Sequence, residues 1–234
     1  MRLIVTRPAS DGQRTAQALA ARGHVAILAP VLEIHLRQGA ALDLDEATAL
    51  VATSANAVRA LARRTHRRDL PLFVVGPHSE AVAHSEGFTT IHSGRGGVTA
   101  LLPLLESQLR PENTVLFHAA PAQSTGTLEE ELTARGFSLR SEILYEARAA
   151  STLPHAAHEA LLAGTADGVL LYSPRSARIF ARLVEEAALA PNCRHLIAYC
   201  ISPAAAAGLG GLPFAARRSA THSDESGMMA LLAP

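Results

Sequence analysis

Short apolar segments alternate with amphipathic or alanine-rich segments along almost the whole chain, and this alternation limits the possible folds most strongly. The apolar segments have the length of strands, and the segments between them have the length and apolar spacing of helices. The expected strands are 2–6, 25–29, 31–37, 49–53, 72–75, 89–92, 114–118, 139–148, 168–172, 195–201 and 213–217. The expected helices are 10–22, 55–65, 78–86, 97–109, 124–135, 154–163, 175–188, 203–209 and 224–232. Strands that alternate with helices form βαβ units, so the sequence predicts an α/β fold with parallel sheets.

Two extended segments, within 31–39 and 138–149, interrupt the alternation. The first follows a strand directly after Pro30, and polar and apolar side chains interleave in the second. Such two-residue periodicity is typical of a strand with an exposed face, not of one buried in a parallel sheet. We expect the two segments to pair as linkers between two domains. The expected division of the chain is a domain formed by 1–30 plus 150–234, the linker strands 31–39 and 138–149, and a second domain formed by 40–137.

Three short motifs occur twice in the chain, in the same order each time. The pairs are Val5–Pro8 with His118–Pro121, Ala52–Arg59 with Leu171–Arg178, and Val75–Ala81 with Ile201–Ala207. The distances between the paired copies differ by only a few residues, as expected for a duplicated unit with small insertions. The sequence therefore predicts that the two domains are related by duplication.

Each of these motifs lies where an expected strand ends and a helix begins. Ligands of open parallel sheets bind at this edge, and free N–H groups at helix N-termini favour anions there. The hydroxyl groups of Thr53, Ser54, Ser173, Ser176 and Ser202 would either cap the helices or donate to a ligand. A cleft between the domains, lined with these donors, would suit a molecule with several carboxylates.

Two further side chains are candidates for this site. Arg7 follows the first strand, where it would either bind an anion or remain an exposed surface residue. Tyr145 lies on the second linker segment, where its hydroxyl would donate a proton unless the ring serves only for packing. Ser124, His118 and Glu129 could be arranged as a catalytic triad, but no G-x-S-x-G motif supports one.

Composition excludes several classes of function. All 21 basic residues other than histidine are arginine, so a Schiff-base lysine and a P-loop lysine are excluded. The 21 acidic residues bring the net charge to zero, which argues against a nucleic-acid-binding protein. The two cysteines have no metal-binding spacing. Neither a signal peptide nor a membrane-spanning segment is recognisable, so we expect a cytoplasmic protein with no membrane partner.

An ordered set of short motifs resembles the uroporphyrinogen-III synthase family over essentially the whole chain. These motifs are Ile4–Pro8, Pro30–Ile34, Thr53–Val58, Val74–Gly76, Leu144–Glu146, Tyr172–Ser176 and Ile201–Pro203. The resemblance implies two flavodoxin-like domains with parallel sheets, joined by a two-stranded β-ladder. It also implies a monomeric lyase without cofactor or metal, which cyclises hydroxymethylbilane to uroporphyrinogen III in tetrapyrrole and haem biosynthesis. That reaction inverts ring D and releases water.

The resemblance also implies roles for individual residues. Tyr145 matches the tyrosine that is proposed to assist departure of the substrate hydroxyl group. The expected substrate-binding residues are Arg7, Thr53, Ser54, Asn56, Gly76, Ser173, Ser176 and Ser202. The sequence departs from the family at Ala204 and Ala205, where hydroxyl side chains are usual, so only backbone contacts are expected there.

Two other functions remain open from the sequence. The first is a non-catalytic ligand-binding or regulatory module on the same duplicated scaffold, since a fold alone does not fix a function. The second is a flavin-binding relative of flavodoxin. With no tryptophan and three tyrosines, the chain offers few side chains to stack on a flavin ring.

Overall fold

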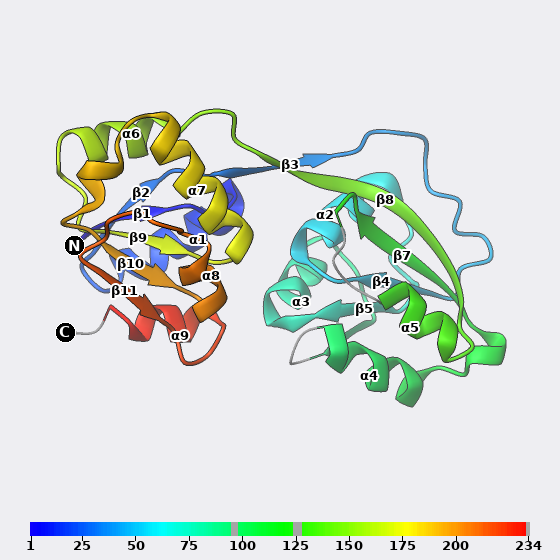
Figure 1. Ribbon diagram of the computed structural model, residues 1–234. Helices are drawn as coiled ribbons and strands as arrows, with labels where there is room; N and C mark the ends of the chain where they lie inside the picture. Colours follow the sequence, from blue (N-terminus) through cyan, green and yellow to red (C-terminus); the bar gives the residue numbers. More distant parts are fainter. Residues whose placement is uncertain (95–97, 124–127, 233–234) are drawn as a thin grey trace. The chain divides into compact units, whose positions relative to one another are not determined.

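The computed structural model describes residues 1–94, 98–123 and 128–232, and its elements follow the predicted alternation (Figure 1). The strands are β1 (Arg2–Val5), β2 (Val25–Leu28), β3 (Leu32–Leu36), β4 (Ala49–Ala52), β5 (Leu72–Val75), β6 (Ile91–Gly94), β7 (Val115–Pro121), β8 (Ser138–Ala149), β9 (Gly168–Leu171), β10 (Ile197–Cys200) and β11 (Ala216–Ser219). The helices are α1 (Ala9–Ala20), α2 (Ala55–Arg64), α3 (Gly76–Ser85), α4 (Leu101–Gln108), α5 (Leu128–Ala134), α6 (His155–Leu162), α7 (Pro174–Glu186), α8 (Pro203–Ala207) and α9 (Glu225–Ala230). The predicted α/β fold is thus confirmed.

A few differences concern the ends of elements. Short 3-10 helices, which the sequence analysis did not predict, lie at Val98–Ala100, Pro111–Asn113 and Ala190–Cys193. The expected helices 97–109 and 124–135 both begin outside the described residues, and their described parts form α4 and α5.

The chain divides into two compact units. Unit 1 contains Met1–Glu33 and Arg148–Pro234, and unit 2 contains Ile34–Ala147. The sheet of unit 1 has the strand order β11-β10-β9-β1-β2, and all of its strand pairs are parallel. Counted along the chain this order is 2-1-3-4-5, which is the order of flavodoxin. Helices α1 and α9 contact each other on one face of this sheet, and α7 and α8 contact each other on the other.

The second sheet has the order β3-β8-β7-β4-β5-β6. Strands β4 to β8 pair in parallel. Strand β3 lies beside β8 at the edge, where Arg37 N–H donates to the Leu144 carbonyl and Ala150 N–H donates to the Val31 carbonyl. Residue numbers rise along β3 as they fall along β8, so these two strands are antiparallel. The segment 138–149 is therefore also a full member of a sheet, because its first half pairs with β7.

The duplicated motifs identify equivalent strands in the two sheets. They match β1 with β7, β4 with β9 and β5 with β10. With these matches, the order β2-β1-β9-β10-β11 of unit 1 corresponds strand by strand to β8-β7-β4-β5-β6 of unit 2. The first copy of the repeat supplies β1 and β2 to the sheet of unit 1 and β4 to β6 to the sheet of unit 2. The second copy supplies β7 and β8 to the sheet of unit 2 and β9 to β11 to the sheet of unit 1. Each sheet is therefore assembled from parts of both copies.

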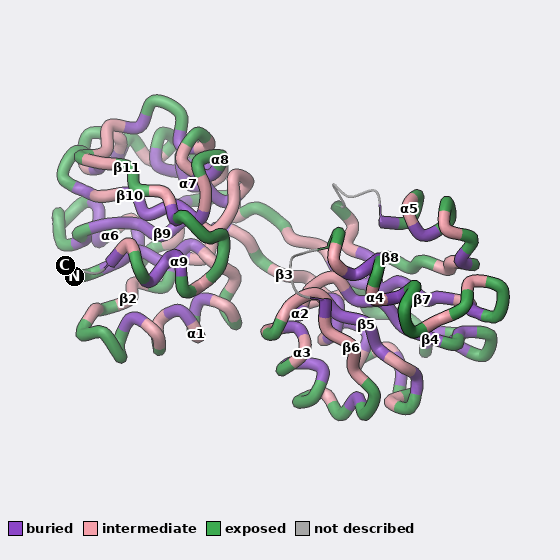
Figure 2. Tube along the Cα trace, turned by 90° about the horizontal axis from the view of Figure 1, so that it is seen from below, coloured by how far each residue is buried: buried purple, intermediate pink, exposed green. Residues whose placement is uncertain are grey.

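The inner strands of both sheets are buried, as the purple colour of their trace shows in Figure 2. In β4, Leu50 and Ala52 pack into the cluster beside α2 and α3. Ala49 and Val51 alternate with them and pack into the cluster beside α4 and α5. Burial on both faces explains why the strands read as continuous apolar runs in the sequence. Among the described residues, none of the helices is long and apolar enough to cross a membrane.

Candidate active site

The hydroxyl groups of Tyr145 and Ser54 lie 2.8 Å apart in unit 2 and form a hydrogen bond. Tyr145 lies on β8 and Ser54 directly follows β4, and strand β7 runs between these two strands in the sheet. The Tyr145 side chain is almost fully buried, with 7% exposure, whereas Ser54 is partly buried. The sequence analysis selected both residues but did not predict that they touch.

A β-bulge explains how Tyr145 reaches Ser54. The pairing of β7 with β8 is regular up to Ala120 with Ile143, and it then jumps to Pro121 with Tyr145. In a regular strand the neighbours Leu144 and Tyr145 would point to opposite faces of the sheet. Here both belong to the same apolar cluster, which includes the first residues of α2. The bulge therefore turns Tyr145 onto the face where α2 begins.

Ser54 is held in place by helix α2. It is the N-cap of this helix, with extended backbone angles, and its hydroxyl oxygen accepts a hydrogen bond from the Ala57 N–H group at 3.1 Å. Thr53 and Asn56 lie on either side of it and are partly buried, and the Asn56 side-chain oxygen accepts from Arg59 at 3.0 Å. A single short turn of backbone thus positions these three expected ligands beside Tyr145.

Gly76 lies at the next strand end, where β5 passes into α3. Its φ angle of +78° is in the left-handed region, and a Cβ atom built there would have no neighbour within 4 Å. Glycine is therefore required by the backbone conformation and not by crowding. In the sheet β5 lies next to β4, so Gly76 and Thr53 both lie at its carboxyl edge.

Burial controls the protonation of the tyrosine. Burial raises the pKa of the Tyr145 hydroxyl above its ordinary value, and the hydrogen bond with Ser54 offsets this only in part. The hydroxyl group therefore remains protonated at neutral pH and is able to donate a hydrogen bond or a proton. This pair of hydroxyls is suited to assist the departure of an oxygen leaving group.

The expected ligands in unit 1 gather at the carboxyl edge of its own sheet. Ser173 follows β9 and caps α7 by accepting from Ser176 N–H at 3.0 Å, and Ser202 follows β10 and caps α8 by accepting from Ala205 N–H at 3.3 Å. The Ser176 hydroxyl is buried and donates back to the Ser173 carbonyl at 3.0 Å. Arg7 follows β1, where it forms an ion pair with Glu225. Ser173 and Ser202 thus cap their helices as hydrogen-bond acceptors, whereas Ser176 acts as a donor.

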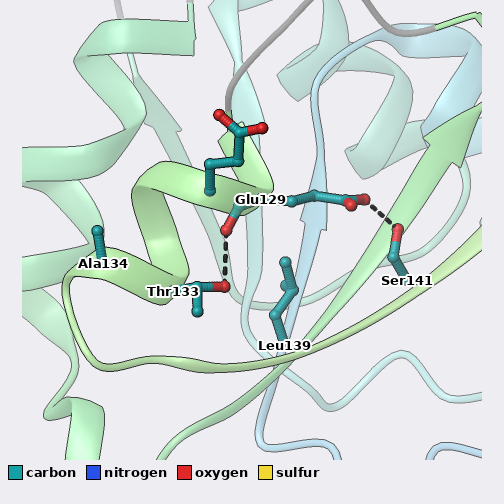
Figure 3. Close-up of a pocket in the computed structure, with 6 residues that line it drawn as sticks. Glu129, Thr133, Ala134, Leu139 and Ser141 are labelled. Carbon is teal, nitrogen blue, oxygen red and sulfur yellow. Dashed lines mark hydrogen bonds between the residues drawn. The ribbon is translucent and has the colours of Figure 1, made fainter.

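Of the three residues considered as a triad, only His118 and Glu129 lie within the described residues. Ser124 lies outside the described residues. His118 is buried on β7, and its Nδ1 atom lies 3.1 Å from Glu129 on α5. A different serine, Ser141 on β8, donates to the same Glu129 oxygen at 2.5 Å (Figure 3). These hydrogen bonds join α5 to β7 and β8.

The buried histidine predicts a loss of stability in acid. Burial lowers the pKa of His118 below its usual value of 6.5, although Glu129 raises it in part. The folded protein therefore binds fewer protons here than the unfolded chain below pH 6.5, so the free energy of unfolding falls as the pH falls. The slope contributed by His118 is at most about 1.4 kcal/mol for each pH unit. We expect His118→Asn to remove this contribution, measured by urea unfolding between pH 7.5 and 5.5.

A matched control for this prediction is His155→Asn, because His155 is an exposed side chain on α6. This control variant should keep the pH dependence of the original chain. An unchanged slope in the His118 variant would mean that the histidine binds protons equally in the folded and unfolded states. The pKa of Glu129 is also lowered, mainly by Ser141, but it titrates only at more acidic pH.

Comparisons with known proteins give consistent results. The sequence model of uroporphyrinogen-III synthase HemD matches residues 13–230 of the chain. The fold is similar to that of uroporphyrinogen-III synthetase from Helicobacter pylori, with a TM-score of 0.67 and 16% identity over 99% of this chain and 98% of that one. It is also similar to a mutant uroporphyrinogen III synthase from the extremely thermophilic bacterium Thermus thermophilus, with a TM-score of 0.50 and 16% identity over 99% and 97% of the two chains. Among curated proteins none matches the chain significantly.

Proposed function

Because the chain belongs to the uroporphyrinogen-III synthase family, we propose that its Tyr145 and Ser54 act together in the reaction of that family. The enzyme is a cyclising lyase of haem biosynthesis, which converts hydroxymethylbilane to uroporphyrinogen III. Departure of the substrate hydroxyl group needs only modest acid assistance, because the pyrrole nitrogen expels it. The protein must chiefly favour the conformation that inverts ring D, which is a matter of positioning.

Tyr145 is the acid that we assign to the leaving hydroxyl group. The support for this assignment is the 2.8 Å hydrogen bond to Ser54, which aims a protonated phenol at the carboxyl edge of the sheet. The hydroxyl of Ser54 is fixed in turn by the first turn of α2. As the phenol gives its proton to the leaving hydroxyl group, which departs as water, the Ser54 hydroxyl donates its hydrogen bond to the phenolate oxygen and stabilises the negative charge there.

The remaining residues would bind the carboxylates of the substrate. Thr53 and Asn56 offer side-chain donors beside Ser54, and Gly76 brings the N-terminus of α3 to the same edge. In unit 1, Arg7 and the helix N-termini capped by Ser173 and Ser202 would supply a second set. The net charge of zero fits this arrangement, because backbone N–H groups bind anions without an excess of basic side chains.

The isomer composition of the product tests the proposed function. Hydroxymethylbilane generated in situ closes without an enzyme to the symmetric isomer I. Adding the protein should shift the product to isomer III, measured by separating the porphyrins after oxidation. Heat-denatured protein is the control and should leave isomer I as the product. Isomer I alone, obtained with folded protein, would support the binding-module alternative instead.

We also propose that the chain works in the cytoplasm, and that it works as a monomer, as the family resemblance implies. Its proposed molecular partners are the linear tetrapyrrole substrate and the cyclic product. Which tetrapyrrole branch uses that product depends on the other enzymes present in the cell.

A further inference from the structure

The carboxylate of Glu225 is the centre of a polar cluster at the carboxyl edge of the sheet of unit 1. Its Oε2 atom accepts from the Arg7 guanidinium at 2.6 Å. Its Oε1 atom accepts from the Tyr172 hydroxyl and from the Thr15 hydroxyl, both at 3.1 Å. These partners come from the end of β1, the middle of α1 and the end of β9, so one side chain on α9 joins the start of the chain to the end of β9.

The guanidinium of Arg7 is fixed on three sides in this cluster. It lies over the ring of Tyr172, with its central carbon 4.2 Å from the ring centroid. Asp11 lies 3.6 Å from its Nη2 atom, while its Nη1 atom donates to both Glu225 and Thr15. The side chain of Arg7 is 15% exposed and that of Glu225 is 29% exposed. Such an arrangement is much less screened than a surface ion pair.

The Tyr172 hydroxyl is a permanent donor in the cluster. Burial, assisted by the negative charge of Glu225, raises the pKa of Tyr172 far above its ordinary value. The phenol therefore keeps its proton throughout the working range of pH and donates to Glu225. Tyr172 directly precedes Ser173, the N-cap of α7, so this hydrogen bond fixes the end of β9 where the expected ligand lies.

The backbone that carries Glu225 is fixed independently of this ion pair. Asp224 caps α9 by accepting from Gly227 N–H at 2.8 Å, and Met228 and Met229 are buried in the core of unit 1. Position 227 admits only glycine, because a Cβ atom there would lie 2.1 Å from the His222 carbonyl oxygen. Neutralising the carboxylate should therefore leave α9 in place and disturb only the groups that the carboxylate holds.

We propose that Glu225 is a positioning residue for substrate binding, which holds the Arg7 guanidinium and the Tyr172–Ser173 strand end in the orientation that receives a substrate carboxylate. The inference rests on the proposed function, since it concerns the same substrate. Glu225 itself is an anion and would not bind a carboxylate. Its role is to keep Arg7 over Tyr172, so that donors of the guanidinium not used by Glu225, Thr15 and Asp11 stay at the edge of the sheet.

Glu225→Gln is the variant that tests this role, because it keeps the size of the side chain and an acceptor for Tyr172. We expect its KM for hydroxymethylbilane to rise roughly tenfold, equivalent to about 1.4 kcal/mol of binding, while kcat changes by less than about twofold. Tyr172→Phe, which removes one donor to Glu225, should raise KM in the same direction by a smaller factor. Thermal unfolding of each variant checks that it is folded.

The matched control is Glu186→Gln. Glu186 also pairs with an arginine, Arg182, at 2.7 Å, but this pair is exposed at the far end of α7 from Ser173. The control variant should keep the KM of the original chain. The double variant with Arg7→Ala should raise KM by less than the product of the two single effects, because Glu225 acts in part through Arg7.

The outcomes separate this inference from the proposed function. If the original chain yields isomer III and Glu225→Gln keeps its KM, Glu225 serves only to anchor α9 and the inference is wrong. Additive effects of the Arg7 and Glu225 substitutions would overturn it as well. If the original chain yields isomer I alone, it is the proposed function that fails.

Discussion

Replacing Tyr145 with phenylalanine should lower kcat by about ten- to a hundredfold without abolishing turnover. A positioned proton donor contributes roughly 10² or more to a rate, but here the pyrrole itself drives most of the departure of the leaving group. The ring would stay in its cluster, and Ser54 would keep its bond to the Ala57 N–H group. The cost in folding stability should therefore be only about 1 kcal/mol, the usual value of one hydrogen bond.

The measurement is the steady-state rate of isomer III formation together with the ratio of isomers I and III. A slower enzyme leaves more hydroxymethylbilane to cyclise without it, so the fraction of isomer I should increase in the Tyr145 variant. Tyr199→Phe is the matched control, since Tyr199 is also buried but lies on β10, and its hydroxyl donates to the Met1 sulfur at 3.6 Å. Turnover of the Tyr145 variant equal to that of the Tyr199 variant would remove the phenol from the mechanism.

Replacing Gly168 with alanine should destabilise unit 1 by about 3 kcal/mol or more, among the largest effects of a single methyl group. A Cβ atom at this position would lie 2.6 Å from the Ile197 carbonyl oxygen and 2.8 Å from a ring carbon of Tyr199. The backbone has no room to yield, because Gly168 is paired with Leu3 on one side and with Ile197 on the other. The central strands of the sheet would have to separate.

Urea unfolding and limited trypsin cleavage together measure this effect. Because the chain has two compact units, the arginine sites in Met1–Glu33 and Arg148–Pro234 should become sensitive before those in Ile34–Ala147. Gly211→Ala is the control, since a Cβ atom there would have no neighbour within 4 Å, and it should change stability by less than about 0.5 kcal/mol. Equal stability of the two variants would show that β9 and β10 are spaced more widely than the structure has them.

The sequence was sufficient to predict the elements and their duplication because burial on both faces leaves a simple apolar signal. Segments such as 49–52 and 168–171 are uninterrupted apolar runs. Each is followed two residues later by a serine, Ser54 or Ser173, and this pattern predicts both helix N-caps. The alternating pattern of 138–149 predicts a linker strand but not its pairing with β7. It reflects a strand whose first half has an exposed face within the sheet.

The parts of the site that the sequence did not predict depend on contacts between distant segments. Nothing near Tyr145 in the sequence indicates the bulge that turns it toward Ser54, because the bulge arises from pairing with Ala120 and Pro121. Glu225 likewise reads as an ordinary acidic residue in the first turn of α9. Its importance comes from Arg7 and Tyr172, which approach it only in the folded sheet.

The exchange of strands between the two copies of the repeat imposes an order on folding during synthesis. Unit 2 is continuous and has all of its strands once Ala147 has left the ribosome, so it is able to fold first. The β1–β2 pair must wait for Gly168 and the strands after it, roughly 10 to 30 seconds at ordinary rates of translation. During that time β1 presents an open, apolar edge of the kind that joins other nascent chains. Chaperones that bind extended apolar segments should therefore recognise the emerging N-terminus of this chain in preference to its middle.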